Sequence, residues 1–232
     1  METWGNYQRE RKGKVRLSNF NQNATATVLI SGSGSNLQAF IDLISSKILK
    51  LNILAVISDN KNAHGLIRAK KAKIKTICIE NKKYPNKKIF DQKLSEIIDM
   101  FDPNFIFLAG FMRILRKDFV KKYEGKIINI HPSLLPKYPG LNTHQRAIES
   151  NEKWHGCSVH FVTEEVDEGP LIMQSKIPIL NNDSSDKLAI RVLKREHIIY
   201  PKTAELLISG RIKYKNSQAW LDGQLLQKPI ML

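Results

Sequence analysis

Asn129 and His131 stand two residues apart at the end of the short apolar run Lys126–Ile128. The run predicts a buried strand, and the proline at position 132 forces the chain out of the sheet. Side chains two positions apart on a strand point to the same side. An amide donor and a titratable ring would therefore face one cleft at the carboxyl end of a strand, where open α/β sheets place their ligands. Hydrogen-bond donation beside proton donation is what acyl-transfer chemistry needs.

A carboxylate that could complete this group is Asp167, in an acidic loop closed by Gly-Pro. Asp167 would pair with His131 and hold the protonated ring for donation to a developing oxyanion, while Asn129 donates to the same oxygen. Because 36 residues separate His131 from Asp167, spacing leaves open a solvated loop acid and a purely structural histidine. We expect the nearby His160 to be buried and hydrogen-bonded rather than catalytic. No serine occupies a G-x-S-x-G elbow and no metal-ligand spacing is present, so neither a hydrolase triad nor a metal is predicted.

A second chemical feature is the loop Ser31-Gly32-Ser33-Gly34-Ser35-Asn36, which joins a predicted strand to a predicted helix. Glycines permit positive φ and close backbone approach, and a helix N-terminus offers free N–H groups to an anion. Ser35 or Asn36 could cap the helix. Leu37 replaces the last glycine of a dinucleotide fingerprint, which favours a single phosphate over NAD. The loop alone fits a phosphate site and a tight structural turn equally well.

The elements that must position these residues alternate strand and helix from Thr27 onward. This alternation predicts an α/β fold with an open, mostly parallel, Rossmann-like sheet, helices on both faces and antiparallel strands in the C-terminal part. We expect strands at 27–31, 51–58, 75–80, 105–109, 127–130, 155–162, 171–179 and 211–214. Helices are expected at 36–46, 64–72, 88–101, 117–122, 143–150 and 184–207. The predicted organisation is a basic, polar, disordered tail at 1–26 followed by a single domain at 27–232.

The net charge of +15 among 232 residues raises the question of a nucleic-acid partner. Between Lys47 and Lys93 the chain has 13 Lys or Arg and 3 Asp or Glu, whereas 142–170 is net acidic. The basic residues are mostly scattered lysines without an aromatic ladder, and the chain is also rich in Ile and Asn, whose codons, like those of Lys, are A/T-rich. Compositional drift therefore explains the charge without a nucleic-acid partner, and attraction of small anions is a by-product. No apolar run approaches the length of a membrane span. Two distant cysteines and no secretory signal predict a cytoplasmic protein, as a monomer or homodimer.

From about Thr27 to Gln227 the chain resembles the phosphoribosylglycinamide formyltransferase family. Four stretches carry the resemblance: VLISGSGSNLQAFID, LAGFMRIL, INIHPSLLPKYPGLNTH and HGCSVHFVTEEVDEGP. The resemblance implies transfer of a formyl group from 10-formyltetrahydrofolate, as cosubstrate, to the amine of 5-phosphoribosylglycinamide in purine (IMP) biosynthesis. No metal is implied.

The resemblance also assigns roles to residues. The catalytic trio would be Asn129, His131 and Asp167. The ribose-phosphate end of the substrate would contact Gly34, Ser35, Asn36 and Glu196, and the folate would contact Lys87, Met112, Arg113, Ile114, Leu115 and Asn129. Lys87 stands where the family has an arginine, so it keeps the charge but loses the bidentate fork for a glutamate tail.

Three rivals share features with this interpretation. Methionyl-tRNA formyltransferase has the Asn-x-His core but normally a further C-terminal RNA-binding domain, and only 65 residues follow Asp167. A 10-formyltetrahydrofolate hydrolase would carry a regulatory domain where this chain has a polar tail. A non-enzymatic RNA-binding module would show salt-sensitive RNA affinity and no formyl transfer.

Overall fold

The computed structural model describes residues 24–232, so most of the expected tail, 1–23, lies outside the described residues. The elements are β1 (Ala24–Ile30), α1 (Ser35–Ser45), β2 (Leu51–Ser58), α2 (His64–Lys71), β3 (Thr76–Cys78), a 3-10 turn η1 (Asn81–Lys83), α3 (Lys87–Asp99), β4 (Phe105–Leu108), α4 (Lys117–Lys122), β5 (Ile127–His131), α5 (Thr143–Glu149), β6 (Trp154–Phe161), β7 (Leu171–Pro178), α6 (Ser185–Ile208), β8 (Ile212–Lys215), β9 (Gln218–Leu221), β10 (Gln224–Leu225) and β11 (Ile230–Met231).

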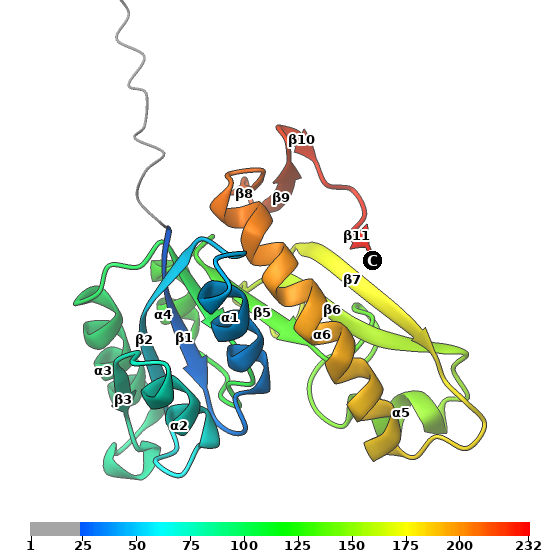
Figure 1. Cartoon of the computed structure of the whole chain (residues 1–232), viewed down its shortest axis with the longest axis horizontal. Helices are drawn as coiled ribbons and strands as arrows, with labels where there is room; N and C mark the ends of the chain where they lie inside the picture. The colour runs from blue at the N-terminus through cyan, green and yellow to red at the C-terminus, as the bar shows by residue number, and fades with distance from the viewer. Residues whose placement is uncertain (1–23) are drawn as a thin grey trace, which may run out of the picture.

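Eight strands form one sheet in the order β11-β7-β6-β5-β4-β1-β2-β3 (Figure 1). Neighbours from β5 to β3 are parallel, whereas β6 runs antiparallel to both β5 and β7. The predicted fold class, including the antiparallel C-terminal strands, is therefore confirmed. From β1 the chain proceeds outward through β2 and β3, then returns to the other side of β1 to form β4 and β5. Open α/β sheets bind ligands at the carboxyl ends of strands beside such a reversal of direction.

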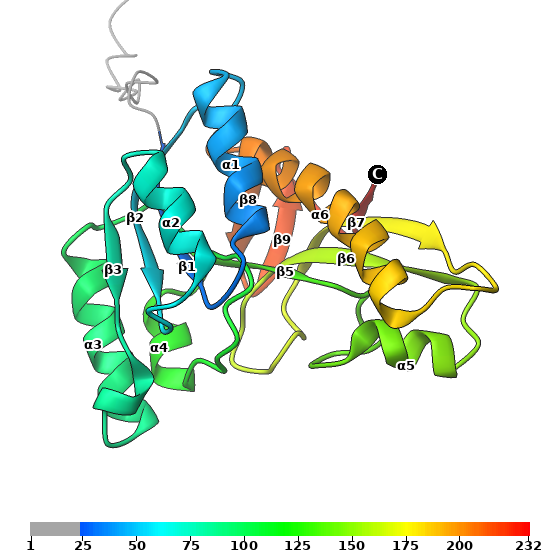
Figure 2. The same ribbon diagram turned by 60° about the horizontal axis from the view of Figure 1, so that its bottom comes forward.

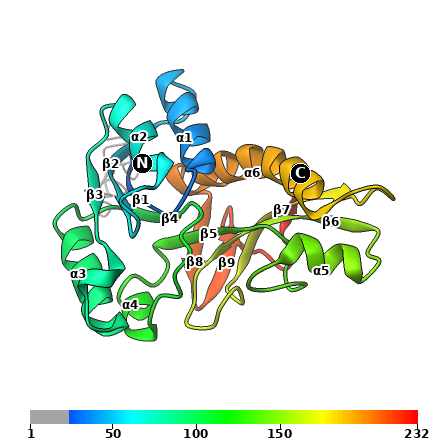
Figure 3. The same cartoon turned by 90° about the horizontal axis from the view of Figure 1, so that it is seen from below.

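Helices cover both faces of the sheet. Successive residues of a strand point to opposite faces, so each strand contributes side chains to two hydrophobic cores. Val28 and Ile30 of β1 pack with residues of α1, α2 and α6, whereas Leu29 between them packs with residues of α3 and α4. The same alternation continues on β5, where Ile128 joins the α6 core and Ile127 joins the α3–α4 core. Figure 2 shows α1 and α6 in front of the sheet, and Figure 3 shows α1 and α2 on the opposite side from α3 and α4.

Two parts of the fold differ from the sequence prediction. The first strand begins at Ala24, so residues 24–26 belong to the sheet and not to the tail. A second, three-stranded sheet, β10-β9-β8, follows α6, and β11 pairs with the outer edge of β7, none of which was predicted beyond one strand near Arg211. In the part of the chain that the structure describes, no helix is both long and apolar enough to cross a membrane.

Candidate active site

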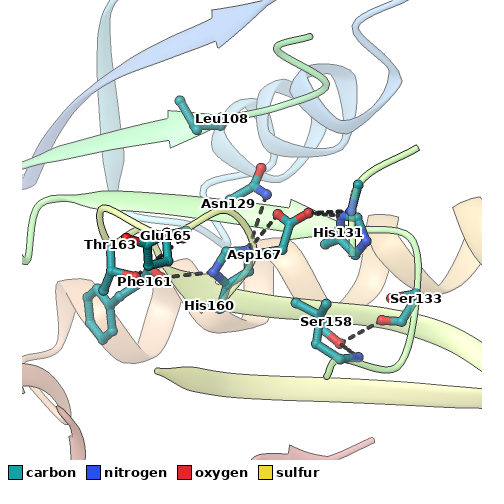
Figure 4. Close-up of polar contacts among 12 residues, drawn as sticks. Leu108, Asn129, His131, Ser133, Ser158, His160, Phe161, Thr163, Glu165 and Asp167 are labelled. Atoms are coloured by element: carbon teal, nitrogen blue, oxygen red, sulfur yellow. Dashed lines mark hydrogen bonds and ion pairs between the residues drawn. The ribbon is translucent and has the colours of Figure 1, made fainter. Parts of the chain in front are cut away.

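Asp167 lies between two histidines at the carboxyl end of β5 (Figure 4). Its Oδ2 is 3.3 Å from His131 Nδ1, and its Oδ1 is 3.7 Å from His160 Nε2. All three side chains are at least nine-tenths buried. At such burial a carboxylate interacts strongly with neighbouring donors, because little water screens it.

The pairing of β5 with β6 explains why these residues meet. The antiparallel register sets Asn129 opposite His160 and His131 opposite Ser158. Directly opposed residues in an antiparallel pair point to the same face of the sheet. Ile128, Ile130, Val159 and Phe161 occupy the α6 core on the other face, so hydrophobic burial fixes this register.

His160 orients the amide of Asn129. The Nδ1–H of His160 donates to the carbonyl of Phe161 at 2.8 Å, which leaves Nε2 as an acceptor for Asn129 Nδ2 at 3.2 Å. Burial lowers the pKa of His160 to about 4, so the ring is neutral near pH 7 and keeps this acceptor. An amide nitrogen carries two protons, so the second N–H of Asn129 remains for a substrate oxygen.

His131 has an oxygen beside each ring nitrogen. Its Nδ1 faces Asp167, and its Nε2 lies 2.9 Å from the carbonyl oxygen of Tyr138. Only a ring with a proton on both nitrogens can donate to both oxygens. The geometry therefore suits a positively charged His131. The ring does not point freely into a cleft, as the strand-end pattern had suggested, because Tyr138 already occupies its Nε2.

The loop that carries Asp167 is fixed at several points. Asp167 has φ of 58°, in the left-handed region that is uncommon outside glycine and often marks functional residues. Its Oδ2 also accepts the backbone N–H of Gly140 at 2.8 Å. Gly169 packs so tightly that an added Cβ would lie 1.8 Å from the carbonyl oxygen of Phe161. On the outer side, Lys117 of α4 pairs with Glu165 at 2.5 Å.

The glycine loop after β1 forms a second polar group. Gly34 precedes α1 with φ of 68° and no side chain caps the helix, so the expected capping by Ser35 or Asn36 is wrong. Asn36 instead donates through Nδ2 to Glu196 Oε2 on α6, at 2.7 Å. Both residues are buried, and burial raises the pKa of Glu196 above its usual range although the Asn36 bond opposes this. The remaining amide oxygen of Asn36 is buried without a protein partner.

Helix α6 connects the two polar groups. One turn after Glu196, the buried hydroxyl of Tyr200 lies 3.0 Å from the carbonyl oxygen of Leu108 and 2.9 Å from that of Ile128, the residue before Asn129. The Tyr200 ring packs against Phe40 of α1 and Phe107 of β4, with ring centroids 5.0 and 5.6 Å away. The glycine loop and the strand end with Asn129 are thus both in contact with the same helix.

Comparison with known proteins identifies the family of this chain. A sequence model of the family described as formyl transferase matches residues 25–204. The phosphoribosylglycinamide formyltransferase of Escherichia coli (strain K12) is 48% identical over 199 residues, which cover 86% of this chain and 94% of that protein. The chain belongs to the formyltransferase family. The solved phosphoribosylglycinamide formyltransferase of Coxiella burnetii superposes with a TM-score of 0.86 at 48% identity, covering 90% of this chain and 99% of that one.

A second solved relative agrees with this formyltransferase. Glycinamide ribonucleotide transformylase 1 from Symbiobacterium toebii has a TM-score of 0.83 and 38% identity, over 87% of this chain and 95% of that chain. Both matches span nearly the whole of each relative. The Rossmann-like fold and the transferase class are therefore established for this chain.

The segment predicted to contact folate does not present one uniform surface in this formyltransferase. Met112 and Ile114 are 73% and 62% exposed, which leaves their side chains free to contact a ligand. Leu115 is buried in the α3–α4 core, and the Arg113 guanidinium stacks on the Phe90 ring at 4.1 Å. Neighbouring residues of this irregular segment thus face solvent and core in turn.

Lys87 is exposed and is the first residue of α3. The helix was expected to begin at residue 88, which would have left Lys87 in the preceding loop. The side chain of Asn86 caps α3 by accepting from the Ile89 N–H at 3.0 Å. Phe90, in the first turn of α3, contacts Arg113, which connects the helix that begins at Lys87 to the 112–115 segment.

The sequence prediction missed the direct contacts of His160 with this group. It treated His160 as a buried residue, which is correct, but not as the acceptor that orients Asn129, with its Nε2 3.7 Å from Asp167 Oδ1. The antiparallel pairing of β6 with β5 would have indicated this contact, because the register of the pair sets His160 opposite Asn129. Among residues 24–232, no three His, Cys, Asp or Glu side chains are grouped so as to hold a metal ion.

Proposed function

We propose that this formyltransferase transfers the formyl group of 10-formyltetrahydrofolate to the amine of 5-phosphoribosylglycinamide, giving formylated phosphoribosylglycinamide and tetrahydrofolate in purine biosynthesis. The observation that carries the proposal is the group formed by Asn129 with the buried side chains of His131 and Asp167, in a chain 48% identical to an enzyme of that name. The names of the relatives indicate which amine accepts the formyl group. The site offers a hydrogen-bond donor for the oxyanion, Asn129, beside a proton donor, His131.

In the proposed reaction the free amine attacks the formyl carbon, and the formyl oxygen becomes an oxyanion. Asn129 donates its second amide N–H to this oxygen. His131 donates from Nε2 after exchanging the Tyr138 carbonyl for the substrate, since catalytic hydrogen bonds often form only in the reactive complex. Asp167 orients His131 through its contact with Nδ1. The attacking nitrogen then loses a proton, N10 of the folate gains one, and the carbon–N10 bond breaks without a covalent enzyme intermediate.

We propose further that the two substrates bind on either side of this group. The loop residues Gly34 and Ser35, with Asn36 and Glu196, would hold the ribose-phosphate end, where a helix N-terminus favours an anion. Met112 and Ile114 would line the apolar slot for the pterin, together with the backbone of Arg113 and Leu115. Lys87 would face the glutamate tail. In this proposal the excess of lysine attracts small anions and not a nucleic acid.

One assay tests the function against its rivals. The purified full chain is mixed with 10-formyltetrahydrofolate and, in separate reactions, phosphoribosylglycinamide, charged initiator tRNA or water as the acceptor, and tetrahydrofolate release is followed by absorbance. The expected result is rapid release with phosphoribosylglycinamide alone, with the formylated amine found by mass spectrometry. Faster turnover with the charged tRNA or with water would overturn the proposal.

A further inference from the structure

Helix α2 holds the glycine loop from its outer side by two hydrogen bonds to backbone carbonyls. The N–H of Gly65 donates to the Gly32 carbonyl at 3.1 Å. The guanidinium Nε of Arg68, one turn later on α2, donates to the Ser33 carbonyl at 2.9 Å. The loop carbonyls are therefore directed toward α2 at two successive peptide units.

The two segments are in close backbone contact as well. A Cβ added to Gly34 would lie 2.5 Å from the Gly65 Cα and 3.7 Å from Cδ of Arg68. A Cβ added to Gly65 would lie 2.4 Å from the Ile30 side chain. Glycine at both positions lets the backbones meet, and the Arg68 stem lies close to the same contact.

The geometry of the trans peptide determines where the N–H groups of the loop point. In a trans peptide the C=O and the N–H of the next residue point in opposite directions. Because the Gly32 and Ser33 carbonyls point toward α2, the N–H groups of Ser33 and Gly34 point away from it, into the loop's inner side. Within the described residues, neither N–H donates to another protein group. Two convergent free N–H groups are the kind of nest that binds an anion.

The second arm of Arg68 ties the loop to α1. Its Nη1 donates to Gln38 Oε1 at 3.1 Å, and Gln38 Nε2 donates to Asp42 Oδ1 at 2.8 Å. A planar guanidinium can serve the loop carbonyl and Gln38 together, whereas a lysine ammonium has no such fork. Arg68 thus fixes the angle between the loop and the helix that begins after it.

We propose that Arg68 is a positioning residue that sets the affinity of this enzyme for the phosphate of its amine substrate, by holding the Ser33 carbonyl outward so that the loop N–H groups face the phosphate. This inference rests on the proposed function for the identity of the substrate. It assigns to Arg68 no contact with the reacting atoms, so it predicts a change in binding of the phosphorylated amine and not in the chemical step.

The test compares Arg68→Met and Arg68→Lys with Lys71→Met, which removes one positive charge from the same helix at an exposed residue. We expect both Arg68 variants to raise KM for phosphoribosylglycinamide about 10-fold or more, which is the effect of losing a hydrogen bond to a charged group. The KM for 10-formyltetrahydrofolate and kcat should stay near those of the wild type. Inhibition by ribose 5-phosphate, which carries the phosphate without the amine, should weaken by the same factor.

The outcomes separate this inference from the proposed function. A wild-type enzyme that forms no formylated amine contradicts the function itself. An active wild type whose Arg68 variants behave like Lys71→Met overturns the role of Arg68, and so does a fall in kcat with unchanged KM. If Arg68→Lys retains full affinity while Arg68→Met loses it, charge alone accounts for the effect and the positioning role is wrong. Should Arg68→Met fail to fold, the inhibition constants of Arg68→Lys and wild type decide the matter.

Discussion

Glu196 and Asn36, 160 positions apart in sequence, meet through a hydrogen bond of 2.7 Å at the point where α6 crosses α1. Glu196 is 8% exposed, and among residues 24–232 a single neutral amide is the hydrogen-bond partner of its carboxylate. A buried charge with one hydrogen bond destabilises the folded state, because the free-energy cost of its desolvation exceeds the stabilisation from a single hydrogen bond. Such a group persists where it serves binding.

Replacing this carboxylate should therefore separate stability from function. Burial raises the pKa of Glu196 above the usual 4.5, so the folded state loses stability as pH rises through the normal carboxyl range. We expect Glu196→Gln to be more stable than the wild type by about 1 kcal/mol at pH 7.5, with the difference vanishing below pH about 4. KM for the phosphorylated amine should rise about 10-fold or more. Urea unfolding at both pH values and steady-state kinetics measure these effects, and a less stable variant at pH 7.5 contradicts the prediction.

Asp167 supports His131 through a contact that an amide cannot reproduce. In Asp167→Asn the side chain keeps its shape and loses its charge, so the stabilisation of a protonated His131 disappears. We expect kcat to fall about 100- to 1,000-fold, as for loss of one oxyanion-stabilising group. The matched control is Glu168→Gln, which removes a charge from the adjacent exposed residue and should leave kcat unchanged. Turnover of Asp167→Asn near the wild-type rate would contradict the catalytic role of Asp167.

Buried neutral histidines should make the enzyme sensitive to acid. Burial lowers the pKa values of His155 and His160 to about 4, and that of His144, whose Nδ1 lies 3.0 Å from His155 Nε2, is lowered as well. Each of these groups binds a proton more weakly in the folded state than in the unfolded chain. The stability they contribute is therefore complete above pH 6.5 and falls as pH drops toward 4.

Within that range His155 and His160 should each remove about 1.4 kcal/mol of unfolding free energy per pH unit. Urea unfolding between pH 7 and 4.5 measures the slope, and NMR titration of the histidine ring protons identifies the groups. His155 and His160 resonances that titrate near pH 6.5 in the folded protein would contradict this prediction.

The glycine loop offers a matched pair of substitutions. Gly34 has positive φ, and a Cβ there would lie 2.5 Å from the Gly65 Cα, whereas a Cβ at Gly32 would have no atom within 4 Å. We expect Gly34→Ala to cost at least about 1–2 kcal/mol of unfolding free energy from the left-handed backbone alone, and to raise KM for the phosphorylated amine. Gly32→Ala should change neither. Equal effects of the two substitutions on thermal unfolding would show that the contact with α2 is unimportant.

The sequence was sufficient for features that depend on local pattern. Period-two burial placed Asn129 and His131 on one face, and strand–helix alternation predicted the parallel sheet, because each is decided within a few residues. Contacts between distant segments were beyond such patterns. Asn36 was expected to cap its own helix, but a partner brought by α6 forms a bond that no local capping pattern indicates. The role of His160 depends on strand register, which one sequence does not specify.

One error was avoidable. Asp222 and Gly223, both at positive φ, join β9 to β10, and Asp-Gly between short strands is a strong hairpin signal. The strands beside it have only four and two residues, so neither is long enough to show a repeating hydrophobic pattern. By contrast, the exchange of an arginine for Lys87 was visible in sequence, but its place as the first residue of α3 was not.

The position of Glu196 and Tyr200, one turn apart on α6, has a consequence for substrate selection. A single helix sets the separation between the glycine loop, which we propose binds the phosphate, and the strand end that carries Asn129. Helices do not stretch, so this separation acts as a ruler of fixed length. Under the proposed function, we expect phosphorylated amines with a shorter or longer spacer to occupy either end without bringing their nitrogen to the formyl carbon while their phosphate is held.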